Sequence, residues 1–488
     1  MDSNQQMPWD PIYPAERKET RFGIAIALCS LALANFFIFG GPNLGFAVAT
    51  VVCLAISVAY LLSCGHKLRG YPAALLGLCV VIVSGFARSD DSFVKFVMVC
   101  FLLTAVNLSF AILAGQNRRD PVGVTSLLDA PRVLFSLGFG KLPPALRGLR
   151  TAAKNGGAAS KKTGAVLLGL VIAVPILAVM VLLLISADAA FAGLMEQLPE
   201  FDFGELLVTV LLGGGMGCVL FTRAVALRHE ICAPLPERQR KGLHPLTVNT
   251  VLIGVCCVYV VYLLSQLAYF VGGFAGILPQ GYTMAQYARR GFFEMGWLCA
   301  INLSIIALAV ASVRNAGKTP LLSRILCLFI GIVTLFFVVT ASAKMAMYIG
   351  SYGLTRLRVL TEVIMVFLGL ATATVCVWLF APKMPYMKVI VILALVLGAA
   401  VIWADVDTIV AAYNVSAYQS GSLKTVDVGY LTTLSSGAVP YIAKLAEDGN
   451  AAAQQFMDTA SGSDYWNGAY HDLRSWNLAD WLAGNAWK

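Results

Sequence analysis

Long apolar stretches recur along the whole chain, and lysine and arginine collect in the links on alternate sides of them. Most stretches approach the ~20 residues that an α-helix needs to cross the ~30 Å hydrocarbon core of a bilayer. Hydrophobic residues make up 59% of the 488 residues and charged residues only 12%, which excludes a water-soluble domain. We therefore predict an all-α, polytopic membrane helix bundle. The eleven predicted spans are residues 22–40, 44–64, 71–86, 94–114, 164–186, 205–224, 246–271, 295–313, 324–349, 359–381 and 388–404.

The distribution of the basic residues predicts the orientation of the bundle. With the N-terminus in the cytoplasm, 24 of the 35 lysines and arginines are inside and 11 are outside. The outer links 87–93 and 187–204 are acidic instead. By the positive-inside rule, the N-terminus lies inside and the C-terminal tail outside. The net charge of +9 then reflects contact with anionic headgroups, and no nucleic-acid partner is expected.

The spans and links divide the chain into regions of different character. These are a four-span region (1–115), a basic cytoplasmic loop (116–163), a seven-span core (164–404) and an extracytoplasmic tail (405–488). In the loop, Phe135, Phe139 and Leu142 share one helical face and are expected to rest on the inner leaflet. A docking site for a protein partner is the alternative for this loop.

Small residues and cysteines lie mostly inside the spans. Gly213, Gly214, Gly215 and Gly217 fall together in the sixth span. They indicate either close helix packing or a broken helix of the kind that lines transporter sites, and packing is favoured. Of the 12 cysteines, none lies in an outer loop or in the tail, so no disulfide framework is predicted.

Ionisable residues concentrate on the predicted outer side of spans seven to ten, against the positive-inside bias. Five cations and three acids make up this candidate site: Arg289, Arg290, Lys344, Arg356, Arg358, Asp188, Glu294 and Glu362. Arg358 and Glu362 stand four residues apart, as do Arg290 and Glu294, so each pair can meet on one helix face. The arginines would grip a phosphate or carboxylate. Alternatively, the arginines belong to an internal ion-pair network. This also agrees with the rule that a charged side chain inside a membrane is energetically costly and usually pairs with an opposite charge.

Enzyme signatures are missing from the sequence. The four histidines lie in predicted inner loops or in the tail, and no phosphate-binding loop, nucleophile elbow or zinc-protease helix occurs. We therefore predict no catalytic residue, no metal and no cofactor, and an activity other than catalysis is favoured.

The tail is expected to fold into ordered helices rather than to be disordered. From about Val426 it carries apolar residues at helical spacing, separated by turn residues. We predict short helices that bury Val428, Leu431, Leu434, Val439 and Ile442 over the outer ends of spans seven to ten. Asp427, Glu447 and Asp448 are the acids predicted to approach the outer arginines.

Three ordered motifs carry a family resemblance. They are Y-A-R-R-G-F-F-E at 287–294, Y-G-L-T-R-L-R at 352–358 and D-V-G-Y-L-T-T-L-S-S-G-A-V-P at 427–440. The chain resembles, over roughly residues 164–445, bacterial multi-pass membrane proteins grouped as a domain of unknown function of the 4173/4153 type. Gly437 departs from that pattern, in which an acid precedes Ala438. The resemblance implies a bacterial plasma membrane and supplies no established activity.

Three functional classes remain open from the sequence. The first is a non-enzymatic envelope, sensory or partner-binding protein, whose partner binds the loop 116–163 or the tail. The second is a transporter or lipid-handling protein with an outer anion site for an anionic lipid or a lipid-linked phosphate. The third is a membrane-embedded transferase acting on a lipid-phosphate substrate, which needs a carboxylate base or a metal beside the cations. In every class the lipid bilayer is a partner.

The predicted orientation can be tested with single cysteines in an otherwise cysteine-free chain. An impermeant thiol reagent added to intact cells should label Ser461→Cys and should leave Ser160→Cys unlabelled until the membrane is opened. The opposite labelling would invert the topology.

Overall fold

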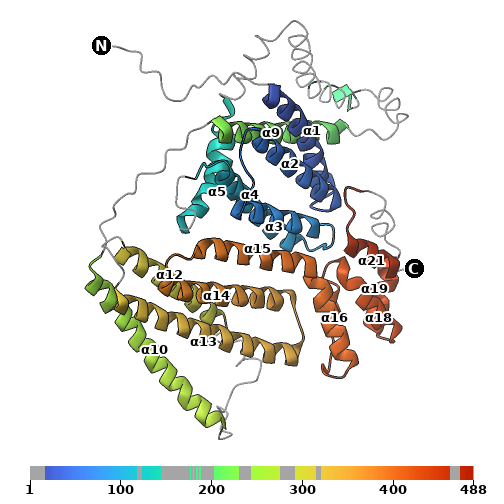
Figure 1. Cartoon of the computed structure of the whole chain (residues 1–488). Helices are drawn as coiled ribbons and strands as arrows, with labels where there is room; N and C mark the ends of the chain where they lie inside the picture. The colour runs from blue at the N-terminus through green and yellow to red at the C-terminus, as the bar shows by residue number, and fades with distance from the viewer. Residues whose placement is uncertain are drawn as a thin grey trace, which may run out of the picture. The chain divides into compact units, whose positions relative to one another are not determined.

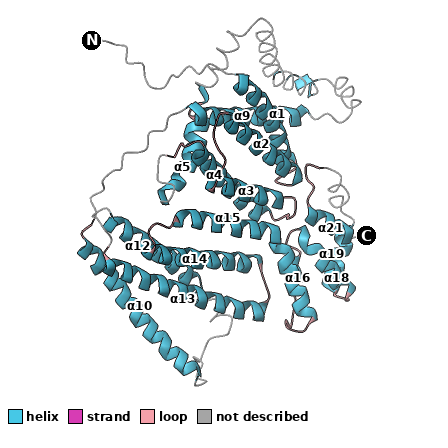
Figure 2. Cartoon of the chain, viewed as in Figure 1, coloured by secondary structure: helices cyan, strands magenta, loops and turns pink. Residues whose placement is uncertain are grey.

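The computed structural model describes most of the predicted bundle and tail. Described are residues 17–117, 124–143, 203–229, 243–274, 292–314, 320–461 and 473–486, with six single positions between 176 and 187. Every regular element among them is helical (Figures 1 and 2). The chain is thus an all-α, polytopic helix bundle, as predicted.

Nine helices in the described part are long and apolar enough to cross a membrane. They correspond to nine of the eleven predicted spans. The predicted span 71–86 forms a shorter apolar helix of 15 residues, α3 (Tyr71–Gly85). The predicted span 164–186 lies almost wholly outside the described residues.

The chain folds as two compact units. Unit 1 comprises residues 1–121, 125–234 and 461–488, and unit 2 comprises residues 122–124 and 235–460. The helices of unit 1 are α1 (Arg17–Phe39), α2 (Leu44–Ser63), α3, α4 (Ser92–Leu113), η1 (Val124–Leu128), α5 (Asp129–Pro131), η2 (Arg132–Phe139), α9 (Phe203–His229) and α21 (Leu478–Ala486). Those of unit 2 are α10 (Pro245–Phe274), α12 (Phe292–Arg314), α13 (Leu321–Tyr352), α14 (Arg356–Phe380), α15 (Tyr386–Ala404), α16 (Val406–Gln419), α17 (Val428–Leu431), η3 (Ser436–Ala438), α18 (Val439–Glu447) and α19 (Ala451–Ser461).

Unit 1 is built on close packing of α1 against α2 and α9. The Phe22 ring stacks on Tyr60 of α2 at 4.3 Å between centroids and on Phe221 of α9 at 6.0 Å. α9 runs unbroken through Gly213, Gly214, Gly215 and Gly217. A Cβ at Gly213 would come within 2.8 Å of the Leu31 Cα, and one at Gly217 would collide with the Ser30 hydroxyl. Gly213 and Gly217 therefore let the backbones of α1 and α9 approach closely, which is the favoured packing role.

The C-terminal end of the chain closes one end of unit 1. The amides of Leu478 and Ala479 donate to the carbonyls of Ala87 and Arg88, at 2.8 and 3.2 Å. The Arg474 guanidinium lies 2.5 Å from the Glu205 carboxylate at the start of α9. The residues that receive this segment are those that the charge pattern assigns to the outer side.

Part of the predicted cytoplasmic loop also packs in unit 1. On η2, Val133 and Leu137 are buried, while Phe135 and Phe139 are exposed and stack on each other at 6.1 Å. The segment is therefore amphipathic, and its two exposed rings fit the predicted rest on the inner leaflet.

Unit 2 has an apolar core between its four long helices α10, α12, α13 and α14. Leu252, Ile306, Ile330 and Phe337 are among its fully buried side chains. A short polar chain crosses this core, because the Tyr259 hydroxyl donates to Asn302 at 2.5 Å and Asn302 donates to Thr334 at 2.9 Å. These hydrogen bonds satisfy the polar groups inside the bundle and hold three helices in register.

The glycine packing predicts opposite outcomes for neighbouring substitutions. Gly213→Ala should lower the thermal midpoint of the purified protein, because its Cβ would meet the backbone of α1. Gly214→Ala is the matched control, since nothing lies within 4 Å of that position. It should leave the midpoint unchanged or raise it, because alanine favours a helix over glycine by ~1 kcal/mol. Equal midpoints for the two variants would contradict this packing.

Candidate functional site

The motif Y-G-L-T-R-L-R forms the connection between α13 and α14. Gly353 ends α13 with φ of +75° and thereby turns the chain. A side chain there would also collide with Asn414 of α16, since a Cβ would lie 2.5 Å from Asn414 Oδ1. The side-chain amide of Asn414 instead forms two hydrogen bonds with the backbone of Leu354. It accepts from the Leu354 N–H at 2.7 Å and donates to the Leu354 carbonyl at 2.8 Å. The connection is therefore clamped by the first helix of the tail.

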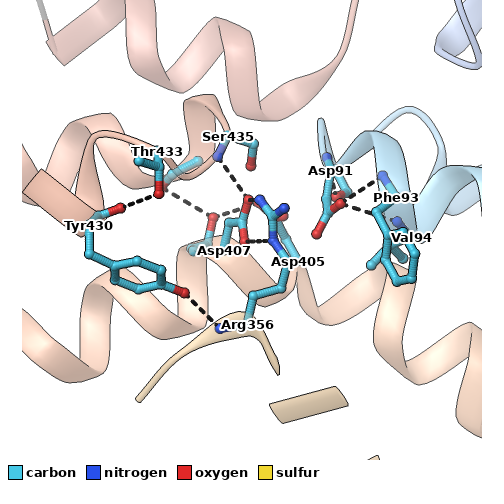
Figure 3. Close-up of polar contacts among 12 residues, drawn as sticks. Asp91, Phe93, Val94, Arg356, Asp405, Asp407, Tyr430, Thr433 and Ser435 are labelled. Carbon is cyan, nitrogen blue, oxygen red and sulfur yellow. Dashed lines mark hydrogen bonds and ion pairs between the residues drawn. The ribbon is translucent and has the colours of Figure 1, made fainter. Parts of the chain in front are cut away.

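Arg356, the first residue of α14, forms a two-pronged ion pair with Asp407 of α16 (Figure 3). Its Nε donates to Asp407 Oδ1 at 2.8 Å, and its Nη2 donates to Oδ2. The Ser435 amide also donates to Oδ2, at 2.8 Å. The Asp407 side chain is 0% exposed and that of Arg356 is 30% exposed. This geometry places a buried carboxylate against the planar guanidinium fork, which is the strong form of the pair.

Tyr430, which belongs to the motif at 427–440, contacts Arg356 as well. Its hydroxyl oxygen accepts a hydrogen bond from the Arg356 amide at 2.8 Å (Figure 3). Asp427 caps α17 by accepting from the Tyr430 amide at 2.9 Å. Burial raises the pKa of the Tyr430 phenol, so the hydroxyl remains protonated at physiological pH. One side chain thus joins α17 to the first turn of α14.

Arg358 has a different environment. Its guanidinium donates to the carbonyls of Tyr352, at 3.2 Å, and of Gly353, and lies 4.2 Å from the Tyr348 ring centroid. A cation at the carbonyl end of α13 is favoured by the helix dipole and by the aromatic face. Within the described residues Arg358 forms no ion pair with Glu362, although the two stand four residues apart. Glu362 Oε1 is buried and lacks a hydrogen-bond partner in that part of the chain.

The other members of the predicted site lie on α12 or α13 or fall outside the described residues. Lys344 lies on α13, two turns before the helix ends, and Glu294 is exposed in the first turn of α12. Arg289, Arg290 and Asp188 lie outside the described residues. The structure therefore brings Arg356 and Arg358 together at one connection, and their approach to Arg289 and Arg290 remains a prediction.

The partners of the arginines differ from those expected. Asp427, Glu447 and Asp448 were the predicted acids, but Asp427 caps a helix and Asp448 accepts from Gln419 at 2.5 Å. Asp407 holds Arg356 instead. The predicted tail helices begin at about Val426, so the prediction does not include α16, which carries Asp407. The helical spacing of Val406, Val410, Ala411 and Asn414, all buried, was the available signal.

Beyond the ion pair, the tail has a small core of its own. Val428, Leu431, Ile442 and Leu445 pack with Ala411 and Val415 of α16. Val439 is also buried and Leu434 packs at the edge. The predicted apolar residues of the tail thus form an ordered helical module on α16.

Gly437 explains how the module closes on the end of α15. Asp405 adopts φ of +52° where α15 turns into α16, and its carboxylate accepts from Thr408 at 2.5 Å. A Cβ at Gly437 would lie 2.6 Å from Asp405 Oδ2. An acidic side chain at position 437 would therefore meet a carboxylate, so glycine is required with this arrangement.

The fold and this connection define a class of polytopic, all-α membrane proteins with a helical tail latched to the span ends. The chain belongs to the family described as domain of unknown function (DUF4153), whose model matches residues 23–445. The resemblance seen in the three motifs is thereby confirmed, and it extends through the first four spans, which the motifs did not indicate. No curated protein and no solved structure matches the chain.

Breaking the ion pair should release the tail. Asp407→Asn keeps the shape of the side chain but leaves Arg356 without its counter-ion, which costs ~3 kcal/mol or more for a buried pair. Trypsin cleavage at the exposed Lys424 and Lys444 should then be about a hundred-fold faster in the reconstituted protein, if cleavage follows the opened population.

Asp448→Asn is the matched control for that experiment. It removes an exposed carboxylate from the same module and should leave the cleavage rate within about two-fold of wild type. Unchanged cleavage of Asp407→Asn would show that the ion pair does not hold the tail.

Proposed function

We propose that the chain is a non-enzymatic, partner-binding protein of the bacterial plasma membrane, and that its tail is the docking platform on the outer face. The observation that carries the proposal is the Arg356–Asp407 ion pair. It commits the fork of Arg356 to a carboxylate of the chain itself, so this arginine serves to hold the tail. The interpretation of the arginines as an internal network is favoured by the same contact.

The tail module offers a surface for a partner. Ile409, Tyr413 and Tyr418 on α16 are 40%, 39% and 38% exposed, whereas Val410, Asn414 and Val415 on the same helix are buried. Exposed tyrosines on a rigid helix supply contact area at low entropic cost, and tyrosine is enriched at interfaces. Since α16 is clamped to the α13–α14 connection, a partner on this surface would act directly on two membrane helices.

A lipid-handling function is the second candidate, and Arg358 favours it. Its guanidinium contacts two carbonyls and a ring but no carboxylate among the described residues. Its positive charge is therefore available to a phosphate at headgroup level. The transferase alternative needs a carboxylate beside the arginines, and the carboxylate that meets Arg356 is fully committed to the ion pair.

Photo-cross-linking in intact cells tests the platform. A photoreactive residue in place of Tyr413 should give a discrete protein adduct, and Asp407→Asn in the same chain should abolish it by releasing the module. The same residue in place of Lys383, in the exposed link between α14 and α15, is the control and should not give this adduct.

Mass spectrometry of lipids retained by the purified protein distinguishes the second candidate. The proposal predicts no lipid that depends on Arg358. A phospholipid bound by wild type and lost from Arg358→Gln, with no protein adduct at Tyr413, would replace the docking function with lipid handling.

A further inference from the structure

Two thiols meet inside unit 1. Cys29 of α1 and Cys53 of α2 approach to 3.1 Å between their sulfur atoms, closer than ordinary non-bonded contact. Cys29 also faces the Ala49 carbonyl at 3.6 Å. A disulfide needs a separation of about 2.05 Å, so small rotations of the two side chains would suffice to form one. Both residues are free cysteines in the structure.

The two helices hold this pair in register. On one side of it, Phe22 stacks on Tyr60 at 4.3 Å, and on the other side Phe37 contacts Phe46 at 5.4 Å. The link between α1 and α2 spans only residues 40–43, which limits sliding of one helix along the other. The thiol contact is therefore fixed by the packing of the hairpin and does not depend on a mobile loop.

A buried cation accompanies the thiols. Arg223 of α9 is only 5% exposed and interacts electrostatically with Cys53. Its Nη1 donates to Asn107 at 3.1 Å and its guanidinium lies 4.8 Å from the Phe110 ring centroid. Its Nε has no hydrogen-bond partner and no carboxylate pairs with it in the described part of the chain. A charge inside a membrane bundle without a counter-ion is costly and points to a functional role.

We propose that Cys29 and Cys53 are a redox-active dithiol, that Arg223 stabilises the Cys53 thiolate during its reaction, and that the electron acceptor is a lipid-soluble quinone. The two S–H bonds break and one S–S bond forms, so the dithiol loses two electrons and two protons. The quinone gains both and becomes the hydroquinone, which balances the reaction. The thiolate is the reactive form of cysteine, and burial inside the bundle opposes its formation at Cys53. The positive charge of Arg223 offsets part of that cost, and the thiolate in turn gives Arg223 a counter-anion at the moment of reaction.

The depth of the pair selects the class of acceptor. At 1.5 Å per residue, Cys29 and Cys53 lie about 14–18 Å from either end of their helices, near the middle of a bilayer. A water-soluble disulfide such as oxidised glutathione cannot reach that depth without a polar path. Cys29 is only half-buried, so a quinone dissolved in the lipid can approach the pair from the side.

Thiol oxidation of the full-length protein in lipid nanodiscs tests the proposal. A short-chain ubiquinone should produce a Cys29–Cys53 disulfide, seen by peptide mass spectrometry, with one hydroquinone formed per disulfide. Cys29→Ser and Cys53→Ser should abolish hydroquinone formation, whereas Cys100→Ser, which removes an exposed thiol of α4, should not change it. Arg223→Gln should slow the reaction by about ten-fold or more, and Arg223→Lys should restore much of the rate.

Two of the outcomes test the proposal on the wild-type protein alone. A wild-type protein whose two thiols stay free under quinone would overturn the proposal. So would a disulfide that oxidised glutathione forms as fast as the quinone does, because the depth argument would then fail. An unchanged rate in a folded Arg223→Gln protein would overturn the assignment of the arginine.

Discussion

A buried charge at the end of a membrane helix has to be neutralised, and the Arg356–Asp407 ion pair meets that constraint in unit 2. Arg356 is the first residue of α14, and the Asp407 side chain that pairs with it is fully buried. Removing either partner would leave an uncompensated charge, at a cost of several kcal/mol. The turn at Gly353, the clamp by Asn414 and the hydroxyl of Tyr430 are all arranged around this contact. The order of the tail therefore depends on the pair.

Periodicity and charge predicted the class of fold because hydrocarbon leaves few solutions: every backbone group must be satisfied inside a helix. The same reasoning predicted that the outer arginines and the tail belong together. It could not predict that Asp407 is the acid that pairs with Arg356. That pairing depends on a sharp turn at Asp405, with φ of +52°, at which α16 starts. Nor could it anticipate that Arg358 would cap α13 rather than pair with Glu362, since the i,i+4 rule ignores the carbonyls of a neighbouring helix.

Arg356, which is partly exposed, and Arg223, which is buried, contrast in a way that bears on function. Arg356 forms a bidentate ion pair with the Asp407 carboxylate, so its charge serves to hold the structure together. Arg223 has an amide, a ring and a nearby thiol, but no carboxylate among the described residues. The first arrangement suits a platform whose position must be fixed for a partner to bind. The second suits chemistry in which a negative charge develops for a short time.

A double-mutant cycle on Arg356 and Asp407 tests the central claim most directly. The quantity to measure is the opening free energy of α16 to α18, from amide hydrogen exchange of Arg356→Met, Asp407→Leu and the double variant in the same lipid. The account predicts that the double variant is no less stable than either single variant, with a coupling energy of ~3 kcal/mol or more. Additive losses in the double variant would mean that the two residues act independently, and the tail would then be held by its apolar core alone.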